Sequence, residues 1–191
     1  GTLAAAHILF EEGLSPDKQF VRFSSSAGNL EVEKQNNKFL RIEMPERTTR
    51  SCVSSPLLVE GLGAYPDETF IGMDCMCVFS DEMIVREMQP EPRILRRIGK
   101  VRGIIVTACS SLLGIDYVTR YFTPLSGVDE DEVSGSIHSL LAPYWGRKLG
   151  KNKMRTKQLS PRGTALSCGI TKDRVWVEGK ADIFMRGHIL I

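Results

Sequence analysis

The chain has 191 residues, 42% of them hydrophobic and 25% charged, and this composition is typical of a globular protein with a sizeable core. Its formal net charge of +2 argues against an obligate nucleic-acid or membrane partner. No apolar run approaches the roughly 20 residues that cross a bilayer, and the sequence shows no signal peptide. We therefore predict a cytoplasmic protein with no nucleic-acid and no membrane partner.

Five cysteines are scattered through the chain, at positions 52, 75, 77, 109 and 168, and none belongs to a C-x-x-C pair. Cys75 and Cys77 are two residues apart on a predicted strand, so their side chains share one face. The spacing of the five does not offer the four ligands of a zinc site. We interpret them as reduced thiols of a protein from a reducing compartment.

The first 45 residues predict one helix followed by three short strands. The helix occupies residues 2–12 and ends at Gly13. Alternating apolar and polar residues predict strands at 19–25, 29–33 and 39–44, with turn-forming residues between them. This pattern indicates a three-strand meander that ends at Pro45.

A polar and basic stretch at 46–53 is interpreted as a linker. It leads into a short helix at 54–62, in which Ser54 or Ser55 lies near the N-cap and Pro56 in the first turn. Further on, the patterns predict strands at 69–79, 82–86, 103–109 and 116–122 and a basic helix at 93–98. Runs of strands with few helices between them are typical of an α+β protein.

The helix predicted at 136–149 has one apolar face. Apolar residues fall at positions 137, 140, 141, 144 and 145, so this face should be buried and Trp145 should belong to the core. Gly150 is placed to end the helix, and Pro143 inside it should produce a kink. Four more strands are predicted after it, at 155–159, 164–168, 174–178 and 181–186.

An acidic run at 129–132 and a Ser-Gly-Ser sequence precede this helix. Ser134 can cap the helix, which would leave the backbone N–H groups of Gly135 and Ser136 free to hold an anion. Asp131 lies about one turn away and is a candidate proton carrier. The run by itself could also be a solvated turn, and it lacks the later Gly and Glu of a calcium-binding loop.

His138, Asp131 and Ser136 are residue types found together in catalytic triads. All three lie in one short segment, so we instead predict that His138 forms a local hydrogen bond. Seven basic residues between positions 147 and 162 are not interleaved with aromatic residues and are interpreted as a solvated face.

Residues 130–145 resemble the second signature of the PhzF-like phenazine-biosynthesis family, in which Glu-Asp-Pro-(Val/Ala)-Thr-Gly-Ser-Ala runs on into Leu-Ala-Pro-Tyr-Trp. The matching positions are Glu130, Asp131, Val133, Gly135, Ser136 and 141–145. At three positions the chain departs from the pattern, since Glu132 replaces Pro, Ser134 replaces Thr and Ile137 replaces Ala. Ile137 adds bulk near the expected pocket and should affect the size of substrate that fits.

The resemblance implies a diaminopimelate-epimerase-like fold of the α+β class. In this fold two similar β-roll halves each surround a central helix, and the active site lies between them. Residues 1–47 would be the remnant of the first half, 48–180 the second half, and 181–191 a C-terminal strand that returns to the first half. The family's Gly-His motif and its acid/base Glu would lie upstream of Gly1, so the first half is expected to be incomplete.

The function that the resemblance implies is an isomerase reaction, in which a proton is moved by general acid/base catalysis on a small carboxylate-bearing substrate, with no metal and no organic cofactor. Asp131 would carry the proton, and Ser134, Gly135 and Ser136 would bind the substrate. The chain by itself is expected to be inactive because the upstream Glu is missing, and a homodimer is left open. The alternative is a non-catalytic binding or interaction module that kept the fold, which the departures from the signature and the missing Glu favour.

Overall fold

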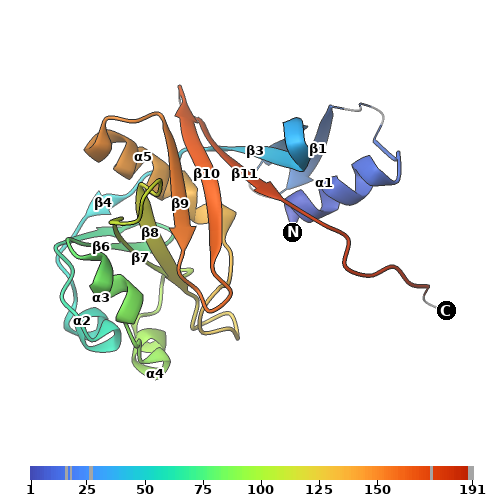
Figure 1. Cartoon of the computed structure of the whole chain (residues 1–191). Helices are drawn as coiled ribbons and strands as arrows, with labels where there is room; N and C mark the ends of the chain where they lie inside the picture. Colours follow the sequence, from blue (N-terminus) through green and yellow to red (C-terminus); the bar gives the residue numbers. More distant parts are fainter. Residues whose placement is uncertain (16, 18, 26–27, 173, 189–191) are drawn as a thin grey trace.

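The structure is a computed structural model that describes residues 1–15, 17, 19–25, 28–172 and 174–188, and the strands within these residues form one continuous sheet (Figure 1). In chain order they are β1 Phe20–Ser25, β2 Gly28–Lys34, β3 Phe39–Pro45, β4 Arg50–Ser51, β5 Glu68–Ile71, β6 Cys75–Phe79, β7 Ile104–Cys109, β8 Tyr117–Phe122, β9 Lys153–Gln158, β10 Thr164–Thr171 and β11 Arg174–Lys180. Across the sheet their order is β1-β2-β3-β11-β10-β9-β8-β7-β6-β5-β4. Neighbouring strands are antiparallel, except that β6 with β7 and β8 with β9 are parallel.

The helices lie on both faces of this sheet. They are α1 Thr2–Glu11, α2 Pro56–Leu62, α3 Glu82–Glu87, α4 Pro92–Leu95 and α5 His138–Leu149, with 3-10 segments η1 Asn36–Lys38, η2 Arg96–Ile98 and η3 Gly135–Ile137. α1 lies against β1–β3, and α5 packs against β9–β11 (Figure 1). The predicted α+β class is thereby confirmed. None of the described helices has the length and apolar character needed to cross a membrane.

The strands β6, β7 and β8 are buried on both faces, because alternate residues enter two different apolar clusters. The cluster around α5 contains Met76, Val78, Ile105, Tyr117 and Tyr121. The cluster under α2, α3 and α4 contains Cys75, Cys77, Phe79, Ile104, Val106, Ala108, Val118 and Phe122. A strand that is covered on both sides has a nearly continuous apolar sequence, which is why these segments could be recognised from the sequence. Cys75 and Cys77 share one face, as predicted.

Burial surrounds α5 on all sides, since every residue from His138 to Gly146 is buried. Pro143 lies inside the helix, as predicted, and its nitrogen cannot donate to the carbonyl of Ser139. The backbone N–H of Arg47 donates to that carbonyl instead, over 3.1 Å. The missing helical bond is thus replaced by one that fastens the segment after β3 to the first turn of α5.

Two predicted helix ends are confirmed by their local geometry. Ser55 is the N-cap of α2, and its hydroxyl accepts a hydrogen bond from the N–H of Leu58 over 3.2 Å. Gly150 ends α5 in the left-handed conformation, with φ of 66°. Glycine adopts this conformation without the steric cost that a Cβ would add.

The single strand predicted at 69–79 is wrong, because the structure has two strands there, β5 and β6, joined by a tight turn. The N–H of Gly72 donates to the carbonyl of Asp74 over 3.0 Å. A Cβ at Gly72 would stand 3.0 Å from the carbonyl oxygen of Thr48, so the site favours glycine. The chain reverses direction within only three residues, and the sequence is apolar on both sides of them. The pattern of apolar residues therefore did not reveal the turn.

The strand predicted at 82–86 is also wrong, because these residues belong to α3. Asp81 is its N-cap and accepts a hydrogen bond from the N–H of Met83 over 2.8 Å. A helix of six residues is too short for its apolar period to be distinguished from that of a strand. The linker predicted at 46–53 also contains the short strand β4.

The strand predicted at 181–186 does not form, and residues 181–188 have no regular secondary structure. Lys180 pairs with Phe39, the first residue of β3, so the chain beyond Lys180 runs past the start of its neighbouring strand. A strand needs a partner for its backbone groups, and β3 offers none beyond that point. Residues 189–191 lie outside the described part, and the division at 47/48 and 180/181 stays a prediction.

Trp145 is 5% exposed, so its predicted place in the core is confirmed. Its ring stacks on Tyr117 with centroids 5.7 Å apart and meets Tyr144 edge-on at 5.2 Å. Its indole N–H donates to the hydroxyl of Thr107 over 2.9 Å. The residue therefore joins α5 to both β7 and β8.

We expect Trp145→Ala to lower the free energy of unfolding by about 3–5 kcal/mol, because it leaves a cavity between α5 and the sheet. Trp145→Phe keeps an aromatic ring but loses the hydrogen bond to Thr107, and should cost only about 1–2 kcal/mol. Urea unfolding followed by circular dichroism measures both. A cost below about 1 kcal/mol for the alanine variant, the range of ordinary surface changes, would contradict the packing described.

Candidate active site

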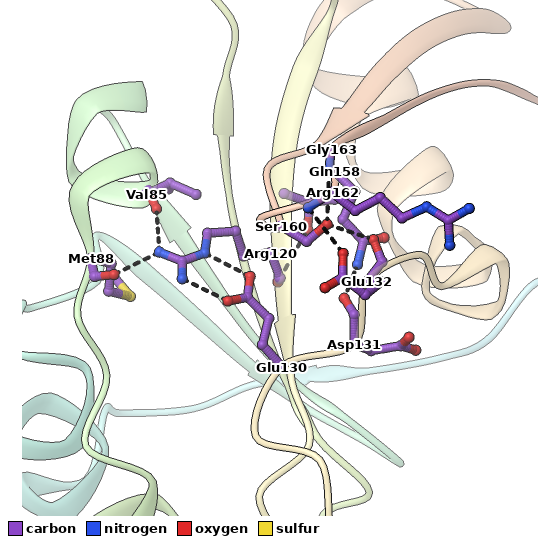
Figure 2. Close-up of polar contacts among 11 residues, drawn as sticks. Val85, Met88, Arg120, Glu130, Asp131, Glu132, Gln158, Ser160, Arg162 and Gly163 are labelled. Carbon is purple, nitrogen blue, oxygen red and sulfur yellow. Dashed lines mark hydrogen bonds and ion pairs between the residues drawn. The ribbon is translucent and has the colours of Figure 1, made fainter.

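In the acidic turn between β8 and η3, the carboxylate of Glu130 has a structural role. Arg120 on β8 binds it with two nitrogens, Nε to Oε1 at 2.8 Å and Nη2 to Oε2 at 2.7 Å (Figure 2). The third nitrogen of Arg120 donates to the carbonyls of Val85 and Met88 at 3.3 and 2.6 Å. A two-pronged arginine pair of this kind is both strong and directional. It fixes the turn to the end of α3.

Two further carboxylates of the turn are bound from other loops. Arg96 donates to Asp129 over 2.9 Å at the surface. The carboxylate of Glu132 accepts the N–H of Arg162 over 3.0 Å, and its carbonyl accepts the hydroxyl of Ser160 over 2.7 Å (Figure 2). Glu132, where the family signature has Pro, therefore helps to hold the loop between β9 and β10.

Asp131 differs from its neighbours, because no described residue forms a hydrogen bond or ion pair with its carboxylate. The side chain is partly exposed, and it points away from the Arg120–Glu130 pair in Figure 2. Its backbone, by contrast, is well anchored, since its N–H donates to the carbonyl of Tyr121 over 2.9 Å. The structure thus presents one free carboxylate on a fixed backbone.

Gln158 at the end of β9 joins this carboxylate-bearing turn to the start of the helix. Its side-chain nitrogen donates to the carbonyl of Asp131 over 2.5 Å, and its side-chain oxygen accepts the N–H of Ser134 over 2.9 Å. The residue is 0% exposed. Both groups of one buried amide are therefore used to set the separation between Asp131 and the Ser-Gly-Ser segment.

The predicted helix cap at Ser134 is wrong. Ser134 makes no side-chain capping bond, and its hydroxyl instead lies 3.4 Å from that of Ser136. The chain enters the helix through the 3-10 turn η3, so α5 begins only at His138. Ser139 donates its hydroxyl to the carbonyl of Ser136 over 2.7 Å, which tightens this first turn. Because its N–H is bound by Gln158, Ser134 has only its hydroxyl to offer a ligand.

The N–H groups of Gly135 and Ser136 stand at the beginning of η3, where a helix supplies no acceptors for its own donors. No other described residue accepts from them. A Cβ placed on Gly135 would meet nothing within 4 Å, so there is open space in front of this backbone. Such an end of a helix attracts anions. Ile137 does not face that space as predicted, because it is 0% exposed and belongs to the core around α5.

His138 does not form a triad with Asp131 or Ser136. Its Nδ1 lies 2.8 Å from the hydroxyl of Tyr117 on β8, which in turn lies 3.1 Å from the sulfur of Cys168 on β10. No described residue forms a hydrogen bond with Nε2. The predicted local hydrogen bond is therefore wrong, since the partner comes from another strand. Burial lowers the pKa of His138 to about 4 and raises the pKa of Cys168 to about 11, so both are neutral at pH 7.

Gln158 was missed by the sequence analysis, although its strand was predicted. Met154, Thr156 and Gln158 alternate along β9 and are all buried. A polar amide on the inward face of a strand is costly unless it is hydrogen-bonded, and this was the available signal. Its two partners lie 24 and 27 residues away in the chain, so they could not be inferred from the sequence.

We expect Gln158→Met to destabilise the protein by about 2–4 kcal/mol, because the N–H of Ser134 and the carbonyl of Asp131 would both lose a buried partner. Methionine fills nearly the same volume, so packing should change little. The matched control is Arg155→Met on the exposed face of the same strand, with an expected cost below about 0.5 kcal/mol. Equal unfolding midpoints for the two variants in urea would contradict the role given to Gln158.

The buried neutral His138 should make stability depend on pH. Its pKa is about 4 in the folded protein and about 6.5 in an unfolded chain. Its contribution to the free energy of unfolding is therefore complete above pH 6.5. As the pH falls from 6.5 towards 4, about 3 kcal/mol of this free energy is lost. Urea unfolding between pH 7 and 4 should show a shallower decline for His138→Phe than for the unchanged protein. His188→Gln, at an exposed position, is the control, and an unaltered slope in His138→Phe would refute the assignment.

Comparison with known proteins places this geometry in a family. A family model described as phenazine biosynthesis-like protein, PhzC-PhzF, matches residues 1–187. An uncharacterized isomerase of Pseudomonas aeruginosa is 34% identical over 188 residues, which are 98% of this chain and 71% of the relative. The structure of a PhzF-family phenazine biosynthesis protein from Enterococcus faecalis has a TM-score of 0.90 at 32% identity, over 100% of this chain and 72% of that one.

A more distant similarity concerns the fold alone. A probable proline racemase from Agrobacterium radiobacter has a TM-score of 0.65 at 11% identity, over 100% of this chain and 66% of that one. The fold is therefore shared with racemase-like proteins. The family model covers nearly the whole chain, and the relatives are similar throughout it. The chain belongs to the PhzC-PhzF family of phenazine biosynthesis-like proteins.

Proposed function

We propose that the protein is a PhzF-like isomerase that moves a proton on a small carboxylate-bearing substrate by general acid/base catalysis, without a metal or an organic cofactor. The name of the Pseudomonas aeruginosa relative, an isomerase, supports the reaction class. The observation that carries the proposal is the bridge made by Gln158. It ties the backbone of Asp131, whose carboxylate has no partner among the described residues, to the backbone of Ser134, which directly precedes the N–H groups of Gly135 and Ser136.

In this proposal the N–H groups of Gly135 and Ser136 bind the substrate carboxylate. They stand at the positive end of the helix dipole, so they favour a negative group. When a proton leaves a carbon near that carboxylate, the negative charge that develops can spread onto it and is stabilised by the same donors. Ser134 and Ser136 add hydroxyl groups that can hydrogen-bond a further polar atom of the substrate.

Asp131 would remove or deliver the proton, since its carboxylate is not engaged by another side chain. An isomerisation also requires a proton at a second position, and the family resemblance implies that a Glu of the first β-roll half shares this task. Asp129, Glu130 and Glu132 each accept a hydrogen bond from another residue, which leaves Asp131 as the member of the turn whose carboxylate has no partner among the described residues.

The test follows deuterium from D2O into a panel of small carboxylic acids that carry a weakly acidic C–H bond, with the natural gene product that contains this chain as the enzyme. We expect exchange into at least one acid, and a rate about 10²–10⁴-fold lower for Asp131→Asn, with binding retained. The matched control is Asp129→Asn, two residues earlier in the same turn, which should change the rate by no more than about twofold.

Two outcomes would decide against the proposal. Equal rates for Asp131→Asn and the unchanged enzyme would show that this carboxylate does not carry the proton. Binding of the acids without exchange by any of them would favour the non-catalytic binding module. Ser134 and Glu132 depart from the family signature and would then mark a site adapted to binding.

A further inference from the structure

A second pocket lies along α5 and is not lined by Gly135 or Ser136. It is a cavity of about 150 Å³ between α5, the strands β5 and β6, and the segment that follows β3. Its apolar wall consists of Phe70, Met76, Leu140, Pro143 and Tyr144. The polar part of its lining comes from residues 46–49 and from Arg147. The space equals that of about five liquid water molecules, which suits an acid with one small ring.

Arg47 lines this pocket with a guanidinium group that has spare hydrogen-bonding capacity. The side chain is only 27% exposed, and its Nη1 is buried without a hydrogen bond from any described residue. No described residue accepts a hydrogen bond from its other side-chain nitrogens either. The nearest carboxylate oxygen belongs to Asp74 and lies 3.9 Å away, beyond hydrogen-bonding distance.

Asp74 cannot satisfy Arg47, because other residues already bind it. Arg102 donates to its two oxygens over 2.9 and 2.5 Å, and the hydroxyl of Tyr121 donates to one of them over 2.8 Å. Nη1 has almost no exposed surface, but no described residue binds Nε or Nη2 either, so these two nitrogens of the guanidinium can bind an additional anion. The backbone of Arg47 is held by its bond to the carbonyl of Ser139, which Pro143 leaves without a helical donor.

The pocket lining also carries a pair of opposite charges, Glu46 and Arg147. Arg147 is 72% exposed there and is only loosely paired with Glu46, at 3.7 Å. The rings of Phe70 and Tyr144, which also line the pocket, form an edge-to-face pair with centroids 5.6 Å apart. The pocket therefore combines a cationic end with an aromatic and aliphatic wall. A ligand that matches both has a carboxylate at one end and a small apolar group at the other.

We propose that this pocket is a binding site for a small monocarboxylate with an apolar ring or chain, held by its carboxylate on Arg47 and by its apolar part against Phe70 and Tyr144. The site is independent of the proposed isomerase reaction. Its lining residues on α5 run from Leu140 to Arg147, whereas the proposed catalytic residues precede the helix. A charge-assisted hydrogen bond in a partly buried pocket gives such a ligand its orientation, and the apolar wall gives it most of its affinity.

Benzoate is a suitable probe, and amide chemical shifts in two-dimensional ¹H–¹⁵N NMR spectra report where it binds. We expect a dissociation constant of about 1 mM, a value in keeping with a ligand of this size. The shifts should centre on Thr48, Thr49 and Phe70. Benzamide, which lacks the charge, and acetate, which lacks the ring, should each bind about tenfold more weakly or worse.

The decisive variant is Arg47→Gln, which should weaken benzoate binding about tenfold or more. It should fold, because Asp74 keeps Arg102 and Tyr121 as partners. The matched control is Arg50→Gln, an exposed arginine three residues further on, which should bind benzoate as the unchanged chain does. Should Arg47→Gln not fold, Arg147→Gln at the exposed mouth decides the matter, with an expected loss of about threefold.

Three results would overturn the proposal. The first is the absence of benzoate-induced shifts at residues 46–49 up to about 50 mM, well above the expected constant. The second is a set of shifts confined to Gly135 and Ser136, which would show that benzoate binds only at the proposed catalytic site. The third is that Arg47→Gln binds benzoate as well as Arg50→Gln does. If Arg47→Gln does not fold, the corresponding result is that Arg147→Gln binds benzoate as well as the unchanged chain does.

Discussion

Every residue of α5 from His138 to Gly146 is buried, so strands and loops must enclose this helix on all sides. A helix in that position packs against every neighbouring element, so the loss of one side chain disturbs the packing of several of them. Its enclosure also decides which of its backbone groups remain available. The first donors, at Gly135 and Ser136, stand at the start of the short turn η3 and have no acceptor in the part of the chain that the structure describes. The only carbonyl that Pro143 deprives of its helical donor is taken by Arg47.

In the acidic turn, the tertiary structure gives similar residues different contacts. Four consecutive acidic side chains occupy positions 129–132. Those of Asp129, Glu130 and Glu132 are bound to Arg96, Arg120 and the loop after β9. Arginine side chains pair with Asp129 and Glu130, whereas Glu132 accepts a backbone N–H, and these contacts fasten the turn to its surroundings. The carboxylate of Asp131 has no partner within the described part of the chain, and a free, positioned carboxylate is what general acid/base chemistry requires.

Pro143 affects the contacts that the first turns of α5 make with other segments. It lines the apolar wall of the second pocket and frees the carbonyl that anchors Arg47. The hydroxyl of Ser139 also reaches the carbonyl of Ser136. Arg47 and Ser136 are therefore connected through the two polar groups of one residue. This is a contiguous physical path between the second pocket and the proposed catalytic segment.

Much of the structure followed from local patterns in the sequence. The apolar stripe of α5, its end at Gly150 and the strands that are buried on both faces depend on residues close together in the chain. Short elements were less accessible, since α3 and the hairpin between β5 and β6 span too few residues for an apolar period to develop. The α+β class was correct because it depends on the order of the longer elements.

The sequence by itself determined that an acidic turn precedes a helix with Gly135 at its start, and the resemblance to the PhzF-like signature pointed to Asp131 within that turn. Only the tertiary structure decided which of the acidic residues is free, because their partners lie up to 33 residues away. It also replaced the predicted cap at Ser134 by the bridge from Gln158, and it placed Arg47 beside a helix that lies about 90 residues later in the chain. Local chemistry fixes which groups a segment can offer, whereas contacts between distant segments decide which of them are left for a ligand.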